Sequence, residues 1–226
     1  IMMLAVDEAH CVSEWGHDFR PDYRNLGRFR QLLPDVPIMA LTATAMPRVR
    51  SDILASLGLR EPLISAQTIF RPNLALSCER RAGSGVAELS RLRSELARYA
   101  GQGGARAVPS TIVYAPTQAT VESVGQYLGQ DPALDGMVEI YHGGLAPAAR
   151  TTAHERFLSG AAPIVAATVA FGMGIDKPDI RRVYHFGAPK TVEEYYQQIG
   201  RAGRDGNLSS CVLMATDSDF SRYKSD

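Results

Sequence analysis

The chain has 226 residues, of which 45% are hydrophobic and 21% are charged, so it is long enough for one large domain or two ordinary ones with buried cores. Basic and acidic residues number 24 each, so net charge gives no argument for a nucleic-acid partner. Three widely spaced cysteines, Cys11, Cys78 and Cys211, speak against a disulfide framework or a structural zinc site. No apolar run approaches the roughly 18 residues of a membrane helix, so no membrane partner is expected.

Short apolar runs alternate with helical patterns along the chain, which is typical of βαβ units and a mainly parallel sheet. Strands are predicted at residues 3–6, 38–41, 111–115, 138–141, 164–167, 182–186 and 211–215. Helices are predicted between them. One carries an apolar stripe over residues 85–100, a second follows the N-cap residue Thr117, and a third begins where Thr191 and Glu194 have the spacing of a capping box.

Two segments are predicted to be connections, residues 68–73 and residues 100–110. We place a domain boundary near Pro72, so residues 1–72 would form a short first lobe and residues 73–226 a fuller second lobe. The predicted fold class is α/β, with two lobes built on mainly parallel sheets.

Two adjacent acids, Asp7 and Glu8, follow the first predicted strand, where open parallel sheets bind their ligands. The first could hold Mg²⁺ on a nucleotide, and the second could orient or deprotonate a water that attacks the γ-phosphate. For an acid pair taken alone, a solvated loop is the more common explanation.

An aromatic loop follows these acids. Trp15 and Phe19 stand among charged residues that include Arg20, and the two rings could stack on bases beside groups that contact a polynucleotide backbone. The alternative is that both rings pack into the first lobe.

Two arginines, Arg201 and Arg204, follow the capped helix near the end of the chain. Small residues separate them and would let a backbone or a ligand come close. Guanidinium groups suit phosphate both in charge and in bidentate geometry, although a solvated helix end would show the same pattern.

Seven stretches of the chain form a series of motifs: DEAH at 7–10, CVSEWGHDFRPDY at 11–23, LTATA at 41–45, TIVYAPT at 111–117, YHGGL at 141–145, ATVAFGMGIDKPDIR at 167–181 and QQIGRAGRDG at 197–206. In sequence and in order they resemble the motifs of the RecQ family of superfamily 2 DNA helicases, with Werner-type members the most similar. The resemblance covers nearly the whole chain. It implies two RecA-like lobes, the first of them incomplete, and a motor driven by ATP.

The resemblance implies roles for single residues. Asp7 would contact Mg²⁺, Glu8 would be the catalytic base for ATP hydrolysis, and His10 would communicate between the nucleotide and DNA sites. Thr42 and Thr44 would couple the two lobes.

Further along the chain, the resemblance makes Arg201 and Arg204 arginine fingers that reach a nucleotide held mainly by the other lobe. Gln197 would lie beside them, and Asp176 would lie near the ribose. The residues expected at DNA belong to the aromatic loop or to the 167–181 motif: Trp15, Phe19, Arg20, Thr168, Gly172 and Lys177.

The chain also departs from the family pattern. The phosphate-binding sequence G-x-x-x-x-G-K-[ST] is absent, together with everything that the family places before the acidic motif, so the chain alone is expected to hold ATP poorly. It stops before the zinc-binding and winged-helix regions of the family, which implies a fragment truncated at both ends. Residues 69–73 read IFRPN in place of the usual FDRPN, and Gln198 replaces a usual glutamate.

The function implied is that of an ATP-dependent helicase that moves 3′ to 5′ on single-stranded DNA and unwinds forked DNA in repair or recombination. It would act in the nucleus of a eukaryote or in the cytoplasm of a bacterium. One alternative is a nucleic-acid-binding or interaction module without hydrolysis. Another is an RNA helicase, because DEAH also occurs there, although the Trp15 loop and FGMGIDKPDI argue against it. Glu8, Arg201 and Arg204 serve phosphoryl transfer and favour the motor.

Overall fold

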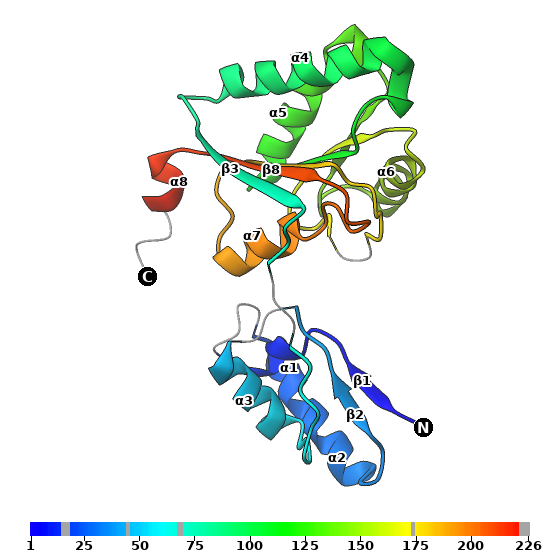
Figure 1. Cartoon of the computed structure of the whole chain (residues 1–226), viewed down its shortest axis with the longest axis vertical. Helices are drawn as coiled ribbons and strands as arrows, with labels where there is room; N and C mark the ends of the chain where they lie inside the picture. The colour runs from blue at the N-terminus through cyan, green and yellow to red at the C-terminus, as the bar shows by residue number, and fades with distance from the viewer. Residues whose placement is uncertain (15–18, 44–45, 67–69, 173–174, 222–226) are drawn as a thin grey trace. The chain divides into compact units, whose positions relative to one another are not determined.

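The computed structural model describes residues 1–14, 19–43, 46–66, 70–172 and 175–221. The chain divides into two compact units, Ile1–Ile69 and Phe70–Asp226. Each unit contains its own parallel sheet with helices packed against it (Figure 1). The predicted α/β class with parallel sheets is therefore confirmed.

The first unit is built on two parallel strands, β1 (Leu4–Val6) and β2 (Ile38–Ala40). The connection between them contains short helices: η1 (Ala9–Val12), α1 (Pro21–Arg24), η2 (Asn25–Gly27) and α2 (Arg28–Leu32). The longer helix α3 (Pro47–Ser56) follows β2 and begins with a proline, whose missing amide is no loss in the first turn. Val49 and Ile53 on α3 pack against Val6, Ala9 and Val12 to form the core of this unit.

The second unit contains six parallel strands in the order β3-β8-β7-β4-β6-β5. The strands are β3 (Leu74–Arg80), β4 (Thr111–Tyr114), β5 (Val138–Tyr141), β6 (Ile164–Ala167), β7 (Arg182–Phe186) and β8 (Ser209–Ala215). The helices are α4 (Val86–Gly103), η3 (Gly104–Arg106), α5 (Gln118–Gly129), η4 (Pro132–Leu134), α6 (Pro147–Ser159), α7 (Val192–Ile199) and α8 (Asp217–Ser221).

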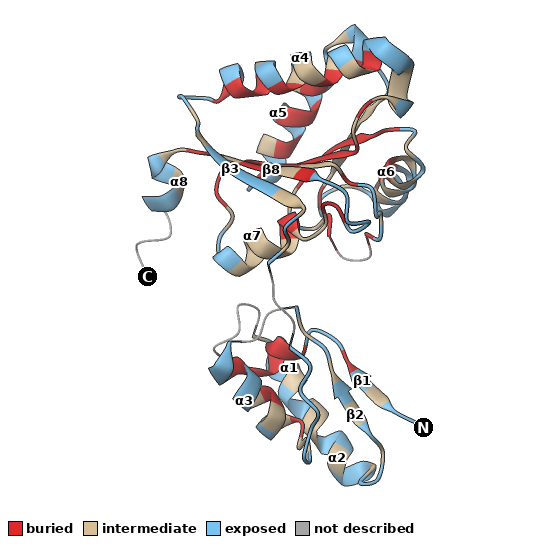
Figure 2. Cartoon of the chain, viewed as in Figure 1, coloured by how far each residue is buried: buried red, intermediate tan, exposed pale blue. Residues whose placement is uncertain are grey.

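Helices cover both faces of this second sheet. α4 and α5 lie on one face, and α6 and α7 lie on the other (Figure 1). Every residue of β4 and β6 is buried, as expected for central strands of a covered parallel sheet. Alternate residues serve the two faces: Val113 packs with α4 and α5, whereas Ile112 and Tyr114 pack with α6 and α7. The buried side of α4 faces the sheet in Figure 2.

The seven strands expected from the sequence are present, with three of them matching at both ends and β8 beginning two residues early. One strand was not predicted. β3 lies at the sheet edge, pairs with β8, and has most of its residues exposed, so its sequence lacks the apolar run of a buried strand. The predicted connection at residues 100–110 contains the last turn of α4 and the short helix η3.

Two of the predicted helix caps are present. The Thr117 hydroxyl accepts a hydrogen bond from the Thr120 amide at 3.1 Å, and the Thr191 hydroxyl accepts one from the Glu194 amide at 3.0 Å. The Glu194 carboxylate accepts a hydrogen bond at 3.0 Å from the amide of Lys190, the residue before the N-cap. Within the described part of the chain, no helix combines the length and the apolar character needed to cross a membrane.

The packing of α5 against β5 generates a stability prediction. A Cβ added at Gly125 would lie 2.4 Å from Cγ1 of Ile140, so Gly125→Ala should lower the free energy of unfolding by roughly 1–3 kcal/mol through overpacking. Gly129 lies on the same helix with open space around it, and Gly129→Ala should stabilise the protein by up to about 1 kcal/mol. Urea unfolding of both variants measures the difference, and equal stabilities would contradict this packing.

Candidate functional site

The acid pair lies where β1 ends. Glu8 has a left-handed backbone, with φ 49° and ψ 41°, which non-glycine residues seldom adopt. Oδ1 of Asp7 accepts a hydrogen bond from the Glu8 amide at 2.8 Å and supports this bend. Such a conformation costs on the order of 1–3 kcal/mol and persists only where the surroundings enforce it. Both carboxylates are therefore held exposed at the carboxyl end of the strand.

His10 connects this bend to the segment that follows β2. Its side chain is buried, and Nδ1 lies 3.0 Å from Oγ1 of Thr42 and 3.3 Å from Oε2 of Glu8. The backbone supports the same connection, because the Ala9 amide donates to the Leu41 carbonyl at 2.9 Å. Glu8, His10 and Thr42, which are predicted site residues from two separate motifs, thus lie together.

Two predicted residues of this unit, Trp15 and Thr44, lie outside the described residues. Phe19 is half-buried, and the guanidinium of Arg24 lies 5.2 Å from the centroid of its ring. Arg20 is exposed. At this described end of the aromatic loop, a cation thus lies against the Phe19 ring, and the guanidinium of the exposed Arg20 lies 6.0 Å from the centroid of the Tyr23 ring.

The arginine site of the second unit forms where the turn after α7 meets the loop after β6. Nη1 of Arg204 donates to the Ile175 carbonyl at 3.1 Å and to Oδ1 of Asp176 at 3.0 Å. Arg201 is half-buried, and a Cβ at Gly172 would lie 2.6 Å from its Nη2. Gly172 therefore leaves the space that the Arg201 guanidinium occupies. The structure brings together four predicted residues, two from each motif.

Tyr114 belongs to this site but was not predicted as a functional residue. It ends β4, is buried, and donates a hydrogen bond to the Phe171 carbonyl at 2.9 Å. Burial raises the pKa of Tyr114 to about 12, and the positive charge of Arg201 opposes this shift. A neutral phenol thus lies next to Arg201 at physiological pH. The sequence could have pointed to Tyr114, because this residue belongs to the TIVYAPT motif. The apolar pattern of that motif, however, predicted only a strand.

The remaining predicted residues of this unit have separate surroundings. Thr168 follows β6, and its hydroxyl accepts a hydrogen bond from the Ala170 amide at 3.4 Å. The Lys177 side chain is only 10% exposed, and its ammonium donates to the Leu158 carbonyl at 3.2 Å and pairs with Asp179 at 3.1 Å. Gln197 is half-buried on α7. Lys177 therefore makes its polar contacts within the second unit.

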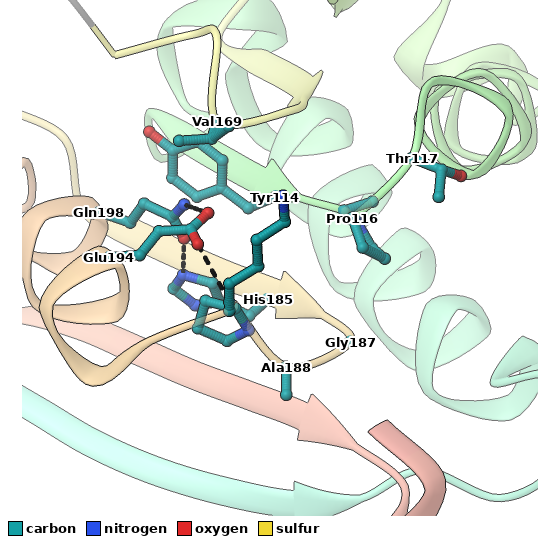
Figure 3. A pocket seen from close by; sticks show the side chains of 12 residues that line it. Tyr114, Pro116, Thr117, Val169, His185, Gly187, Ala188, Glu194 and Gln198 are labelled. Atoms are coloured by element: carbon teal, nitrogen blue, oxygen red, sulfur yellow. Dashed lines mark hydrogen bonds between the residues drawn. The ribbon is translucent and has the colours of Figure 1, made fainter. Parts of the chain in front are cut away.

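A cavity of about 310 Å³ lies at the carboxyl end of β4 and β7, beside α7 (Figure 3). Its wall contains a chain of hydrogen bonds. Nε2 of the buried His185 lies 2.7 Å from Oε1 of Gln198, and Nε2 of Gln198 donates to Oε1 of Glu194 at 3.0 Å. The Glu194 carboxylate also accepts from the Lys190 amide, so these bonds tie α7 to the end of β7. Gln198, noted above as a departure from the family pattern, is thus the link to His185.

Known proteins resemble the chain in sequence and in fold. Residues 91–206 match the family described as helicase conserved C-terminal domain. The bifunctional 3′-5′ exonuclease/ATP-dependent helicase WRN of Mus musculus is 47% identical over 220 residues, which are 97% of this chain and 15% of that protein. The RecQ-like DNA helicase BLM of Xenopus laevis is 40% identical over 223 residues, which are 98% of this chain and 16% of that protein.

A solved structure of Saccharomyces cerevisiae Dbp5 bound to RNA and ADP BeF3 has a TM-score of 0.70 and covers 100% of this chain and 56% of that chain. Its sequence is 20% identical, so this likeness concerns the fold alone. The domain match defines the class as helicases with a conserved C-terminal domain. Within that class, the chain belongs to the RecQ family.

The burial of His185 generates a pH prediction. Burial lowers its pKa from 6.5 to about 4, although the bond to Gln198 opposes this shift. Since the folded-state pKa lies below the unfolded value, the unfolded chain takes up the proton first, and stability is lost as the pH falls from about 6.5 toward 4. Between pH 7 and pH 5 the loss should be about 2 kcal/mol.

Urea unfolding followed by tyrosine absorbance measures this effect in the second unit, because every tyrosine except Tyr23 lies there. His185→Asn removes the titrating group and should flatten the dependence on pH, whatever its effect on overall stability. An unchanged slope in this variant would contradict the assignment to His185.

Proposed function

We propose that the chain is the central part of an ATP-dependent DNA helicase that couples ATP hydrolysis to 3′–5′ translocation on single-stranded DNA and to duplex unwinding in repair and recombination. Residues 1–72 would be the C-terminal part of a first RecA-like lobe, and residues 73–226 the second lobe. The observation that carries this proposal is the strained, exposed Glu8, joined through the buried His10 to Thr42. A module that only binds nucleic acid has no use for such an acid.

Glu8 is the proposed general base that takes the proton of the attacking water. His10 would couple Glu8 to the segment after β2, because its Nδ1 atom lies near both the Glu8 carboxylate and the Thr42 hydroxyl. The exposure of Glu8 supports this role, since its side chain is 51% exposed while that of His10 is 3% exposed.

Asp7 is the residue that would hold Mg²⁺. Among the described residues no group of three or more His, Cys, Asp or Glu side chains could cage a metal. A single exposed carboxylate fits Mg²⁺, because this ion keeps several waters and binds through one or two carboxylates and the phosphates of a nucleotide. Bound Mg²⁺ supplies charge neutralisation at the phosphates.

Arg201 and Arg204 would stabilise the charge that develops on the transferred phosphoryl group, with Gln197 beside them. Two features support this assignment. Gly172 leaves room for the Arg201 guanidinium, and the Arg204 pair with Asp176 is exposed, with 91% of the aspartate side chain accessible. An exposed pair of this kind is weak, so Arg204 can exchange it for a phosphate at small cost. Asp176 would then face the ribose.

The proposed DNA contacts come from Trp15, Phe19 and Arg20 in the first unit and from the 167–181 motif in the second. Thr168, Gly172 and Lys177 are the contact residues that we assign in that motif. Gly172 and Lys177 also make contacts within the second unit, which help to shape the loop on which DNA would lie. The substrate would be single-stranded and forked DNA, in the nucleus of a eukaryote or in the cytoplasm of a bacterium.

ATP hydrolysis with and without single-stranded DNA tests the whole proposal. It should be measured on the 226-residue chain and on a form extended upstream along its natural reading frame. We expect turnover and DNA stimulation in the extended form and little turnover in the chain alone. Binding of DNA without hydrolysis in either form would replace the motor with a binding module, and stronger stimulation by RNA would identify an RNA helicase.

Glu8→Gln should lower the turnover of ATP on the order of 10²-fold or more while ATP still binds, because a positioned base is lost. Glu61→Gln is a matched control, since Glu61 is also an exposed acid with a positive φ, 43°, in the first unit. Steady-state hydrolysis and binding of a fluorescent ATP analogue provide the readouts. Near-normal turnover in Glu8→Gln would remove Glu8 from the mechanism.

Trp15→Ala should spare basal hydrolysis and weaken its stimulation by DNA, through loss of roughly 1–3 kcal/mol of stacking on a base. The readout is the DNA concentration that gives half-maximal stimulation. Equal losses of basal and stimulated rates would instead indicate that Trp15 packs inside its unit.

A further inference from the structure

The start of the second unit is bonded to the turn that carries the two arginines, about 130 residues later in the chain. Nη2 of Arg71 donates to the Ala202 carbonyl at 3.2 Å and to the Gly203 carbonyl at 2.7 Å. Nδ2 of Asn73 donates to the same Gly203 carbonyl at 2.8 Å and to the Asn207 carbonyl at 3.0 Å. Nε of Arg71 donates to Oδ1 of Asn73 at 3.3 Å, which orients the two side chains toward each other.

The turn itself is tightly enclosed. Gly203 has a positive φ of 54°, and a Cβ there would lie 2.5 Å from Nδ2 of Asn73 and 2.7 Å from the Asn207 carbonyl oxygen. Its amide donates to the Ile180 carbonyl at 2.9 Å. Ala202 is fully buried. Only a glycine fits this position, and the bonds from Arg71 and Asn73 fix the direction of its carbonyl.

The chemistry of the turn also favours a guanidinium. The Ala202 and Gly203 carbonyls lie beyond the last residue of α7, and both accept hydrogen bonds from Arg71. Nη2 of Arg71 donates to two successive carbonyls while Nε of the same planar group donates to Asn73, and an ammonium group, with all its donors on one atom, cannot match this arrangement.

The two carbonyls bonded by Arg71 belong to the residues that lie between Arg201 and Arg204. Fixing the Ala202–Gly203 peptide therefore fixes the points from which both arginine side chains extend. Arg71 also follows directly after the boundary between the two units, at Ile69 and Phe70. The same hydrogen bonds thus join the connecting segment to the arginine turn.

We propose that Arg71 and Asn73 are positioning residues, which hold the Ala202–Gly203 turn so that Arg201 and Arg204 are placed for phosphoryl transfer. The proposal rests on the proposed function. Neither residue needs to touch the nucleotide. Their contribution is the orientation of two guanidiniums whose misplacement by about 1 Å can cost on the order of 10²-fold in rate.

The test uses the upstream-extended protein with Arg71→Lys, Arg71→Ala and Asn73→Ala. We expect kcat for DNA-stimulated ATP hydrolysis to fall on the order of 10- to 100-fold while KM for ATP changes little, as expected for contacts that matter only in the transition state. Amide hydrogen exchange at residues 200–206 should be faster in each variant. Arg80→Ala is the control, because Arg80 is an exposed arginine of β3 whose pair with Asp217 is remote in sequence from the turn.

A chemical rescue separates positioning from general damage. Added guanidinium ion should restore part of kcat in Arg71→Ala but not in Asn73→Ala, and circular dichroism checks that each variant is folded. If Arg71→Ala fails to fold, the changes in kcat and KM are measured on Arg71→Lys instead, because this variant retains the positive charge.

Arg201→Ala is the reference variant. If the unsubstituted protein does not hydrolyse ATP, or if Arg201→Ala keeps full turnover, the proposed function fails and this proposal fails with it. If Arg201→Ala loses turnover while the Arg71 and Asn73 variants keep a normal kcat, the positioning proposal alone is overturned.

Discussion

The second unit depends on the burial of its central strands on both faces. β4 and β6 have no exposed residue, because α4 and α5 cover one side of the sheet and α6 and α7 cover the other. No polar chemistry can be placed on those faces without a large desolvation cost. Functional side chains are therefore confined to strand ends and to the connections between strands and helices, which is where the arginine turn, the loop after β6 and the cavity beside His185 lie.

Because of this confinement, α7 both contributes to the cavity wall and leads into the turn that carries the two arginines. Its last turn is held to the end of β7 through the bond between Gln198 and His185, and the turn beyond its C-terminus is held by Arg71 and Asn73. Because the helix has only two turns, both attachments act on one short rigid body. The proposed orientation of Arg201 and Arg204 thus rests on contacts of the last turn of α7 and of the turn that follows it.

The sequence was sufficient to predict elements whose signal is local. The buried strands were found from continuous apolar runs, and the N-caps at Thr117 and Thr191 from residue type and spacing. β3 was missed because an exposed edge strand needs no apolar run. Tyr114, Arg71 and Asn73 were missed as functional residues because their partners lie far away in sequence, and a contact over about 130 positions leaves no periodic pattern. The roles of the motif residues came from family resemblance and not from periodicity.

The left-handed backbone at Glu8 has a consequence for attempts to stabilise the protein. Glycine adopts this conformation without steric cost, and asparagine tolerates it better than glutamate does. Selection for thermal resistance alone would therefore favour replacement of Glu8, although that replacement removes the proposed base. Stability and activity oppose each other at this one backbone position, and a library ranked only by melting temperature would be enriched in inactive sequences.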